Sequence, residues 1–529
     1  MKQGLCVFAA TALLVGMSAG HVALAQKPGG VLKLYSPASP ASLSLLEEAT
    51  IVAEMPMMGV FNNLILFDQH MKQVSLQSIV PDLATRWSWN EDGTELTFNL
   101  RQGVKWHDGK PFTAQDVKWT YDLRLDRAPE KLRVNPGKSA FDNLDHVSTN
   151  GDFEVTFHLK RPEPAFPMLL AGGFSAIFPS HVPPHEMRTH PIGTGPFKFV
   201  EFKPNEDVKV ARNPDYWKPG RPYLDGIEYS IIRDPSTAAL AFVSGKFDMT
   251  FPIDLSVPRM QDIKNQVPQT ICELTPGNIN RHLLVNRDTP PFNNPELRRA
   301  MALSIDRKAF VDTLTQGKGE IGGILQPPPG GLWGMPSDQI DKLPGYDPDV
   351  QKNRAQARSI MEKLGYGPNN RLRTKVTTRD WSIYRDPAVL LIDQLKHVYI
   401  DGELELVDTP QFFPKILRKD FTIALNLQTS GPDPAFVKTF YGCGSSLNWD
   451  GYCNPEVDKL IEQQSRESDP GRRKQVLWTI ERKLAEDSAR PIIFYDPGGT
   501  CLQPWVKGLT LMVNSNYSSW RMEDTWLDK

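Results

Sequence analysis

Residues 81–122, PDLATRWSWNEDGTELTFNLRQGVKWHDGKPFTAQDVKWTYD, place the strongest local constraint on the fold. Trp87 and Trp89 alternate with polar residues, Glu-Asp-Gly at 91–93 supplies a turn, and apolar residues alternate again over 96–100. Alternation with period two on both sides of a turn predicts an antiparallel hairpin. Thr113, with Asp116 three residues later, is typical of a capping box, so a helix should follow the hairpin.

Two further blocks predict that strands and helices alternate along the chain. Residues 193–217, GTGPFKFVEFKPNEDVKVARNPDYW, predict two strands, followed by a strand at 227–232, a helix capped by Asp234 and a strand starting at Phe247. Residues 283–328 form a third block, in which Asn294 and Asp306 each cap a helix. Later helices are expected at 354–364, 387–398, 455–465 and 472–487, and later strands at 372–377, 404–407 and 491–495. Strand, helix and strand with short connections predict an α/β protein.

In this order the three blocks resemble the family 5 solute-binding proteins, which are receptors for oligopeptides, dipeptides, nickel complexes and related cargo in ABC importers. The resemblance implies a two-lobed periplasmic binding protein of type II, similar to cluster C, with an extra domain inserted in the first lobe. It implies a first lobe of residues 26–61, 192–276 and 489–529, an extra domain of residues 62–191 and a second lobe of residues 277–488.

The first 25 residues have the features of a secretory signal. Lys2 is followed by a mostly apolar segment over 5–17 and by Ala-Leu-Ala at 23–25, a small-residue cleavage site. Cys6 lies too near the start to accept a lipid, and no later apolar run is long enough to span a bilayer. The sequence therefore predicts a soluble periplasmic protein that begins near Gln26.

Length and charge limit the domain number and the partners. A chain of 529 residues is too long for one hydrophobic core, so two or three domains are expected. The net charge of -2 argues against a nucleic-acid partner, which requires a strongly basic face. We expect a monomer.

Four cysteines remain after the signal segment, which is an even number for an oxidising compartment. Cys443 and Cys453 enclose a short loop, and we predict a disulfide bond between them. A metal site is the competing interpretation, but no histidine lies near them and their spacing fits no zinc pattern. For Cys272 and Cys501, a long-range bridge and two buried thiols both stay open.

The sequence contains no recognisable catalytic motif. There is no nucleophile elbow and no H-E-x-x-H, so we expect a binding protein with no metal or cofactor. The favoured function is capture of a small solute, peptide-like or a carboxylate-bearing organic compound, in an interlobe cleft for delivery to the permease of an ABC transporter. The alternatives are a sensory or chaperone-like binding protein of the same fold, and a peptidase or amidase on this scaffold.

The resemblance implies a carboxylate anchor at Arg379. Dipeptide-binding members hold the ligand carboxylate with an arginine just after a second-lobe strand, and Arg379 matches that place. A guanidinium suits a carboxylate because it makes two parallel charge-assisted hydrogen bonds. The alternative is a solvated loop in which Arg379 pairs with Asp380 or Asp386.

The expected amine anchor departs from the family pattern. Peptide-binding members place an aspartate shortly before an Asp-Pro or Glu-Pro step, but here Ser430 occupies that place before the Asp433-Pro434 step. Serine cannot supply the counter-charge that a buried ammonium needs, although Asp433 could do so if the loop is reshaped. The sequence therefore favours an organic acid or an amine-blocked ligand. Trp381 and Trp449 are candidates for stacking on a ring of the ligand.

Overall fold

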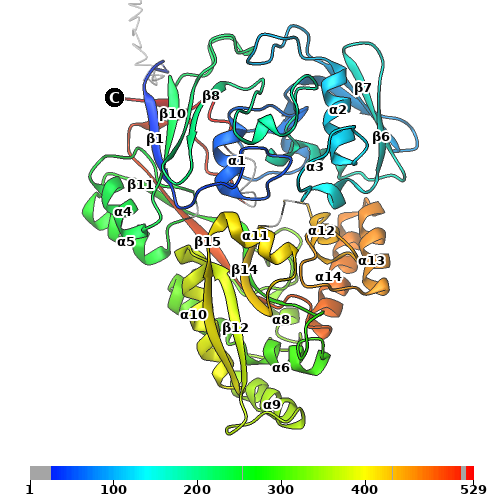
Figure 1. The fold of residues 1–529 in the computed structure, drawn as a ribbon, viewed down its shortest axis with the longest axis vertical. Coiled ribbons are helices and arrows are strands. Elements are labelled where there is room, and N and C mark those ends of the chain that lie inside the picture. The colour runs from blue at the N-terminus through cyan, green and yellow to red at the C-terminus, as the bar shows by residue number, and fades with distance from the viewer. Residues whose placement is uncertain (1–25, 253, 430, 432, 514–519) are drawn as a thin grey trace, which may run out of the picture.

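The computed structural model describes residues 26–252, 254–429, 431, 433–513 and 520–529, so the predicted signal segment lies outside the described residues. Figure 1 shows two lobes, one above the other along the longest axis. We call the upper one, which contains β1 and the C-terminus, the first lobe, and the lower one, which tapers to α9, the second lobe. None of the helices in the described ranges has both the length and the apolar character that a bilayer crossing requires.

The first lobe contains a four-stranded sheet in the order β1-β10-β9-β8. Its strands are β1 (Val31–Ser36), β8 (Phe197–Lys203), β9 (Asp207–Arg212) and β10 (Gly226–Ile231). β1 runs parallel to β10, whereas the other neighbours are antiparallel. Asp234 caps α4 (Pro235–Val243) as predicted, because its carboxylate accepts from the Thr237 N–H at 2.7 Å. The strand expected from Phe247 is reduced to isolated bridges of Met249 with Leu34 and Leu502.

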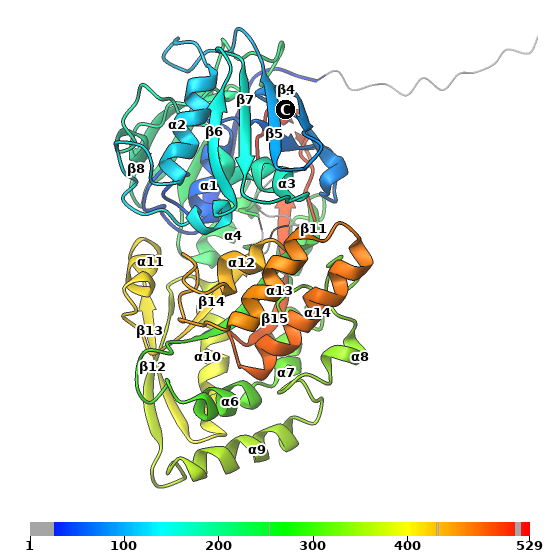
Figure 2. The ribbon, with the colours of Figure 1, turned by 90° about the vertical axis from the view of Figure 1, so that its right-hand side faces the viewer.

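A second four-stranded sheet, all antiparallel, contains the predicted hairpin and has the order β4-β5-β7-β6. Its strands are β4 (Ala84–Trp89), β5 (Glu95–Leu100), β6 (Leu144–Thr149) and β7 (Glu154–Leu159). The register pairs Trp89 with Leu96, which confirms the turn between them. The helix α2 (Ala114–Arg124) follows, and Thr113 and Asp116 form the predicted capping box. Figure 2 shows α2 and this sheet side by side at the top of the molecule.

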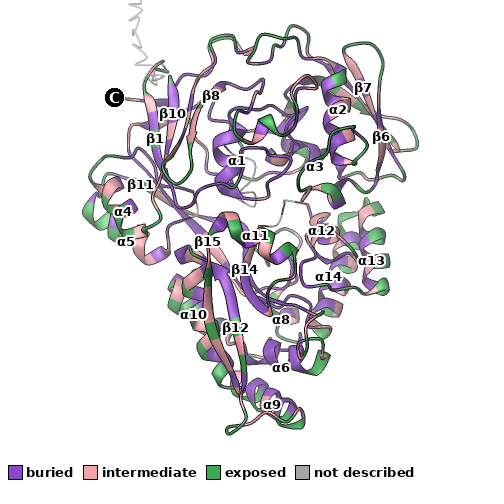
Figure 3. Ribbon diagram, viewed as in Figure 1, coloured by how far each residue is buried: buried purple, intermediate pink, exposed green. Residues whose placement is uncertain are grey.

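The second lobe is built on a five-stranded sheet in the order β13-β12-β14-β11-β15. Its strands are β11 (Ile271–Val285), β12 (Leu372–Arg379), β13 (Ile400–Val407), β14 (Ile423–Thr429) and β15 (Ile492–Leu502). β12 is parallel to both β13 and β14, while β11 is antiparallel to β14 and β15. Figure 3 shows that β11, β14 and β15 are largely buried, whereas exposed residues lie on the outer helices.

Helices surround this sheet. They are α6 (Pro295–Ser304), α7 (Arg307–Thr315), α8 (Ser337–Ile340), α9 (Val350–Lys363), α10 (Ser382–Lys396), α11 (Thr409–Leu417), α12 (Phe436–Tyr441), α13 (Pro455–Arg466) and α14 (Pro470–Glu486). Asn294 and Asp306 cap α6 and α7 as predicted. The helix predicted from Pro387 starts five residues earlier, at Ser382, and Pro387 lies inside it.

β11 and β15 run from the second lobe into the first (Figure 1). Of these two long strands, the sequence predicted only a short segment of the second, at 491–495. Proline is uncommon inside paired strands, and Pro276 and Pro497 interrupt both segments. In the structure both prolines lie within the paired strands, and the register shifts between Pro276 and Asn280. Cys272 and Cys501 lie directly opposite each other on these strands and form a disulfide bond, which answers the question that their spacing left open.

The remaining elements are shorter or connect the sheets. They are α1 (Ile51–Met58), α3 (Phe166–Ala171), α5 (Val257–Gln266), β2 (Ile65–Phe67), β3 (Ile79–Pro81), β16 (Val506–Lys507), β17 (Trp526–Leu527) and the 3₁₀ turns η1 (Leu76–Ser78), η2 (Lys138–Phe141), η3 (Gly173–Ser175) and η4 (Glu186–Arg188).

Candidate ligand-binding site

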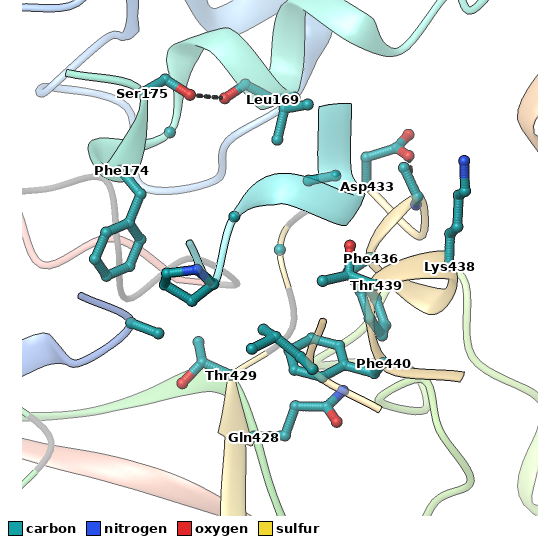
Figure 4. Close-up of a pocket in the computed structure, with 18 of the residues that line it drawn as sticks. Leu169, Phe174, Ser175, Gln428, Thr429, Asp433, Phe436, Lys438, Thr439 and Phe440 are labelled. Carbon is teal, nitrogen blue, oxygen red and sulfur yellow. Dashed lines mark hydrogen bonds between the residues drawn. The ribbon is translucent and has the colours of Figure 1, made fainter. Parts of the chain in front are cut away.

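A cavity with a volume of about 310 Å³ lies between the two lobes. The first lobe contributes residues 48–51, Phe67 and parts of 124–175, and the second lobe contributes parts of 379–465. This volume is within the range of small-molecule sites. Figure 4 shows Phe174 and Leu169 across the cavity from Phe440 and Gln428.

Most of the cavity wall is apolar and aromatic. The aromatic residues that line it are Phe67, Phe141, Phe174, Trp381, Tyr384, Phe413, Phe436, Phe440 and Trp449. Such a wall strengthens electrostatic interactions within the cavity, because it lowers the effective dielectric constant around the few charged groups that reach it.

Arg379 is the most distinctive polar group of the wall. It is the last residue of β12 and only 3% exposed. Its Nε and Nη2 donate to the Thr409 hydroxyl at 3.2 and 3.0 Å, and its Nη1 donates to the Tyr384 hydroxyl. The guanidinium carbon lies 4.6 Å from the Tyr384 ring centroid and 5.6 Å from that of Phe413.

No carboxylate oxygen of the described residues lies within 4.0 Å of the Arg379 guanidinium. The two acids considered as its partners, Asp380 and Asp386, lie 3.9 and 3.4 Å from nitrogens of Arg385 instead. A buried cation whose only polar partners are neutral hydroxyls retains the capacity to bind an anion.

Asp433 lines the cavity but is already neutralised. Its two oxygens accept from Nη1 and Nη2 of Arg473, both at 2.7 Å, and both side chains are 8% exposed. Gln464 holds the same guanidinium through hydrogen bonds to its Nε and Nη2. The carboxylate therefore has a permanent partner, and it could serve a ligand ammonium only by sharing or losing that pair.

The remaining predicted site residues are Trp381, Trp449 and Ser430. Trp381 and Trp449 both line the cavity and are 3% and 6% exposed. The Trp381 N–H donates to Asp254 at 2.6 Å, so this indole is held by the protein itself. Trp449 packs beside Phe413, with 5.4 Å between ring centroids. Ser430 lies outside the described residues.

Glu48 is a cavity residue that sequence reasoning missed. It lies just before α1, accepts from the Thr50 hydroxyl at 3.0 Å, and lines the cavity. Burial raises the pKa of its carboxyl to about 7, although the Thr50 hydrogen bond and the charges of Arg133 and Arg379 lower it. No sequence signal identifies Glu48, because Glu-Glu before a helix is also typical of an exposed N-terminus.

The charges at the cavity wall favour an anion. Among the described residues, the cationic side chains at the wall are Arg124, Arg161, Arg379 and Lys438, and the acidic ones are Glu48, Glu163 and Asp433. Burial also raises the pKa of Glu163, which accepts a hydrogen bond from Asn143. Lys438 pairs with Asp142 at 3.6 Å and Asp433 pairs with Arg473, so three arginines remain against two acids and the wall carries a positive excess.

A disulfide bond fixes one wall of the cavity. The structure joins Cys443 to Cys453, and the loop between them carries two lining residues, Leu447 and Trp449. Asn448, in the same loop, donates to the carbonyls of Gly442 and Tyr452. The described residues contain no group of three or more His, Cys, Asp or Glu that could hold a metal ion.

Comparison with known proteins identifies the family of the chain. The chain matches the family described as "Bacterial extracellular solute-binding proteins, family 5 Middle" over residues 78–448. It is 27% identical to the oligopeptide-binding protein AppA of Bacillus subtilis over 430 residues, which cover 77% of this chain and 76% of AppA. It is 26% identical to the glutathione-binding protein GsiB of Escherichia coli over 477 residues, which cover 86% of this chain and 85% of GsiB.

A solved structure shows the same fold. The periplasmic binding protein DppA of Helicobacter pylori, in complex with the peptide STSA, superimposes with a TM-score of 0.83 at 20% identity, covering 95% of this chain and 99% of that chain. This confirms the predicted two-lobed α/β fold. The family model covers more than half of the chain, so the protein belongs to the family 5 bacterial extracellular solute-binding proteins of ABC importers and is a binding protein rather than an enzyme.

Proposed function

We propose that this protein captures a small organic solute with a carboxylate group and no free ammonium group, and delivers it to the permease subunits of an ABC importer. The observation that carries the proposal is the buried Arg379 guanidinium, which faces the interlobe cavity without a carboxylate within 4.0 Å among the described residues. A ligand carboxylate would supply the missing counter-charge. The curated relatives AppA and GsiB, named for oligopeptides and glutathione, support a peptide-like solute.

The proposed cellular setting follows the sequence features. Residues 1–25 are removed as a signal peptide, and the mature chain acts in the periplasm as a monomer. Residues 26–61, 192–276 and 489–529 form the first lobe, 62–191 the extra domain and 277–488 the second lobe. The separate hairpin sheet supports an extra domain, because all four of its strands fall within 62–191.

The absence of a free ammonium group on the ligand distinguishes this proposal from ordinary dipeptide binding. A free ammonium group would enter a wall with excess positive charge, where Asp433 already pairs with Arg473. Burying an ammonium without an anionic partner is costly. An N-acetylated peptide or another organic acid avoids that cost and still presents a carboxylate to Arg379.

A pair of titrations tests the proposed ligand class. Calorimetry with the dipeptide Ala-Phe and with N-acetyl-Ala-Phe should show clearly tighter binding of the acetylated compound to wild type. A Ser430→Asp variant should reverse the preference, because an added carboxylate offsets the cost of the buried ammonium. Strong preference of wild type for the free amine would refute the proposal and would mean that Asp433 serves the ammonium despite Arg473.

Glu48 should make binding dependent on pH. Because its pKa is raised to about 7, it is mostly neutral below that pH and mostly charged above it. A charged Glu48 repels a ligand carboxylate by about 1–2 kcal/mol at the effective dielectric of a protein site. The affinity for N-acetyl-Ala-Phe should therefore fall roughly tenfold as pH rises from about 5.5 to 8.5.

The matched variants for this pH profile are Glu48→Gln, which should flatten it, and Glu228→Gln, which should leave it unchanged. Glu228 is a partly exposed acid on β10, remote from the cavity lining, that pairs with Lys33. A profile that stays equally steep in Glu48→Gln would assign the titration to another group.

A further inference from the structure

One buried hydrogen bond joins the two lobes beside the cavity. The Trp381 Nε1–H, just after β12 of the second lobe, donates to Oδ1 of Asp254 in the first lobe at 2.6 Å. The other oxygen of the same carboxylate accepts from the Tyr35 hydroxyl of β1 at 2.9 Å. Both Asp254 and Trp381 are 3% exposed. One buried carboxylate thus holds a group from each lobe.

The rings around this contact also cross between the lobes. Trp381 and Tyr384, both from the second lobe, are buried in the hydrophobic cluster that forms the core of the first lobe. The Trp381 ring meets Phe251 of the first lobe edge to face, with 6.3 Å between centroids. Other links between the lobes are more exposed. The Arg233–Asp408 and Lys438–Asp142 ion pairs, at 3.0 and 3.6 Å, should contribute little. Part-buried hydrogen bonds also join Ser446 to the Ser139 hydroxyl and the Pro136 carbonyl, at 2.7 and 2.8 Å.

The same indole contacts the proposed ligand anchor. The Arg379 guanidinium carbon lies 5.4 Å from the Trp381 ring centroid, and its Nη1 donates to Tyr384, which packs against Trp381 with 5.5 Å between centroids. Because Trp381 is held by Asp254, the ring that borders the guanidinium is fixed only while the lobes are together. Opening the lobes would remove that support.

We propose that Asp254 and Trp381 are positioning residues that hold the two lobes closed and keep Arg379 directed at the cavity. The role in directing Arg379 rests on the proposed function, in which Arg379 binds a carboxylate. The role of the hydrogen bond in joining the lobes does not rest on it. Trp381 thus acts through closure and through Arg379 rather than by stacking on the ligand.

The test uses the mature protein, freed of bound solute by unfolding in guanidinium chloride and refolding with its disulfides intact. Small-angle X-ray scattering reports the radius of gyration, and calorimetry reports the affinity for N-acetyl-Ala-Phe. Trp381→Phe keeps an aromatic ring but removes the N–H, so we expect a larger radius of gyration and about tenfold weaker binding, the size expected for a hydrogen bond to a charged group.

Trp505→Phe is the matched control, because Trp505 donates to Asp248 at 2.7 Å within the first lobe alone. Trp505→Phe should change neither the radius of gyration nor the affinity for N-acetyl-Ala-Phe. Asp254→Asn retains an acceptor for Trp381 and should stay closed, whereas Asp254→Leu should open as Trp381→Phe does.

An unchanged radius of gyration in both Trp381→Phe and Asp254→Leu would overturn the interlobe role. If wild type does not bind the acetylated probe, the proposed function fails, and the scattering comparison alone still decides the interlobe role.

Discussion

Arg379→Ala should weaken binding of N-acetyl-Ala-Phe by roughly 2–5 kcal/mol, or about thirtyfold to several thousandfold. The reason is that the ligand carboxylate would be buried in an apolar wall without its cation. The affinity of Arg379→Lys should lie between those of wild type and Arg379→Ala, since an ammonium keeps the charge but cannot make two parallel hydrogen bonds. Calorimetric titration of the three proteins measures the effect.

The matched control is Arg385→Ala, which removes a nearby arginine that pairs with Asp380 and Asp386 and is 40% exposed. It should bind the probe within a few-fold of wild type. Urea unfolding of both variants checks that they are folded, because Arg379→Ala also loses the guanidinium's hydrogen bonds to the Thr409 and Tyr384 hydroxyls. Equal affinities of Arg379→Ala and Arg385→Ala would exclude Arg379 as the anchor.

Asp82→Ala should lower the free energy of unfolding by about 3–5 kcal/mol, because it leaves Arg521 buried without a partner. Both side chains are fully buried, and Arg521 Nη1 donates to Asp82 at 2.9 Å. Burial alone would raise the pKa of Asp82, but Arg521, Lys218 and the hydrogen bonds of the carboxylate hold it below its ordinary value. Asp82 also accepts from Asn62 Nδ2 and from the Asn63 N–H.

Urea unfolding of Asp82→Ala should be compared with Asp312→Ala. Asp312 pairs with Lys308 on the surface of α7, where the side chains are 52% and 76% exposed, so its loss should cost less than about 1 kcal/mol. Similar unfolding midpoints for the two variants would show that the buried pair contributes no more than a surface pair.

Local features of the fold could be predicted from the sequence because a few neighbouring residues determine them. The capping box of Thr113 and Asp116, the caps at Asn294 and Asp306, and the turn before Leu96 all depend on residues within one turn of each other. The length of β11 could not be predicted, since Pro276 is tolerated there only through a register shift against a strand more than 200 residues away.

The site was predictable only where the family resemblance supplied a position. Arg379 was named because dipeptide-binding members place an arginine just after a second-lobe strand, and the structure places it at the cavity wall. Its alternative pairing could be excluded only once Arg385 was placed. The neutralisation of Asp433 by Arg473 and the hydrogen bond of Trp381 to Asp254 join distant parts of the chain, so no local pattern indicates them.

Mass spectrometry of the small molecule released from gently purified mature protein tests most directly whether the interlobe cavity selects a carboxylate. We predict one compound with at least one carboxylate and no free primary amine, recovered from wild type and strongly depleted from Arg379→Ala prepared in parallel. Recovery of a compound without a carboxylate, or of the same compound in equal amount from Arg379→Ala, would contradict the proposed binding mode.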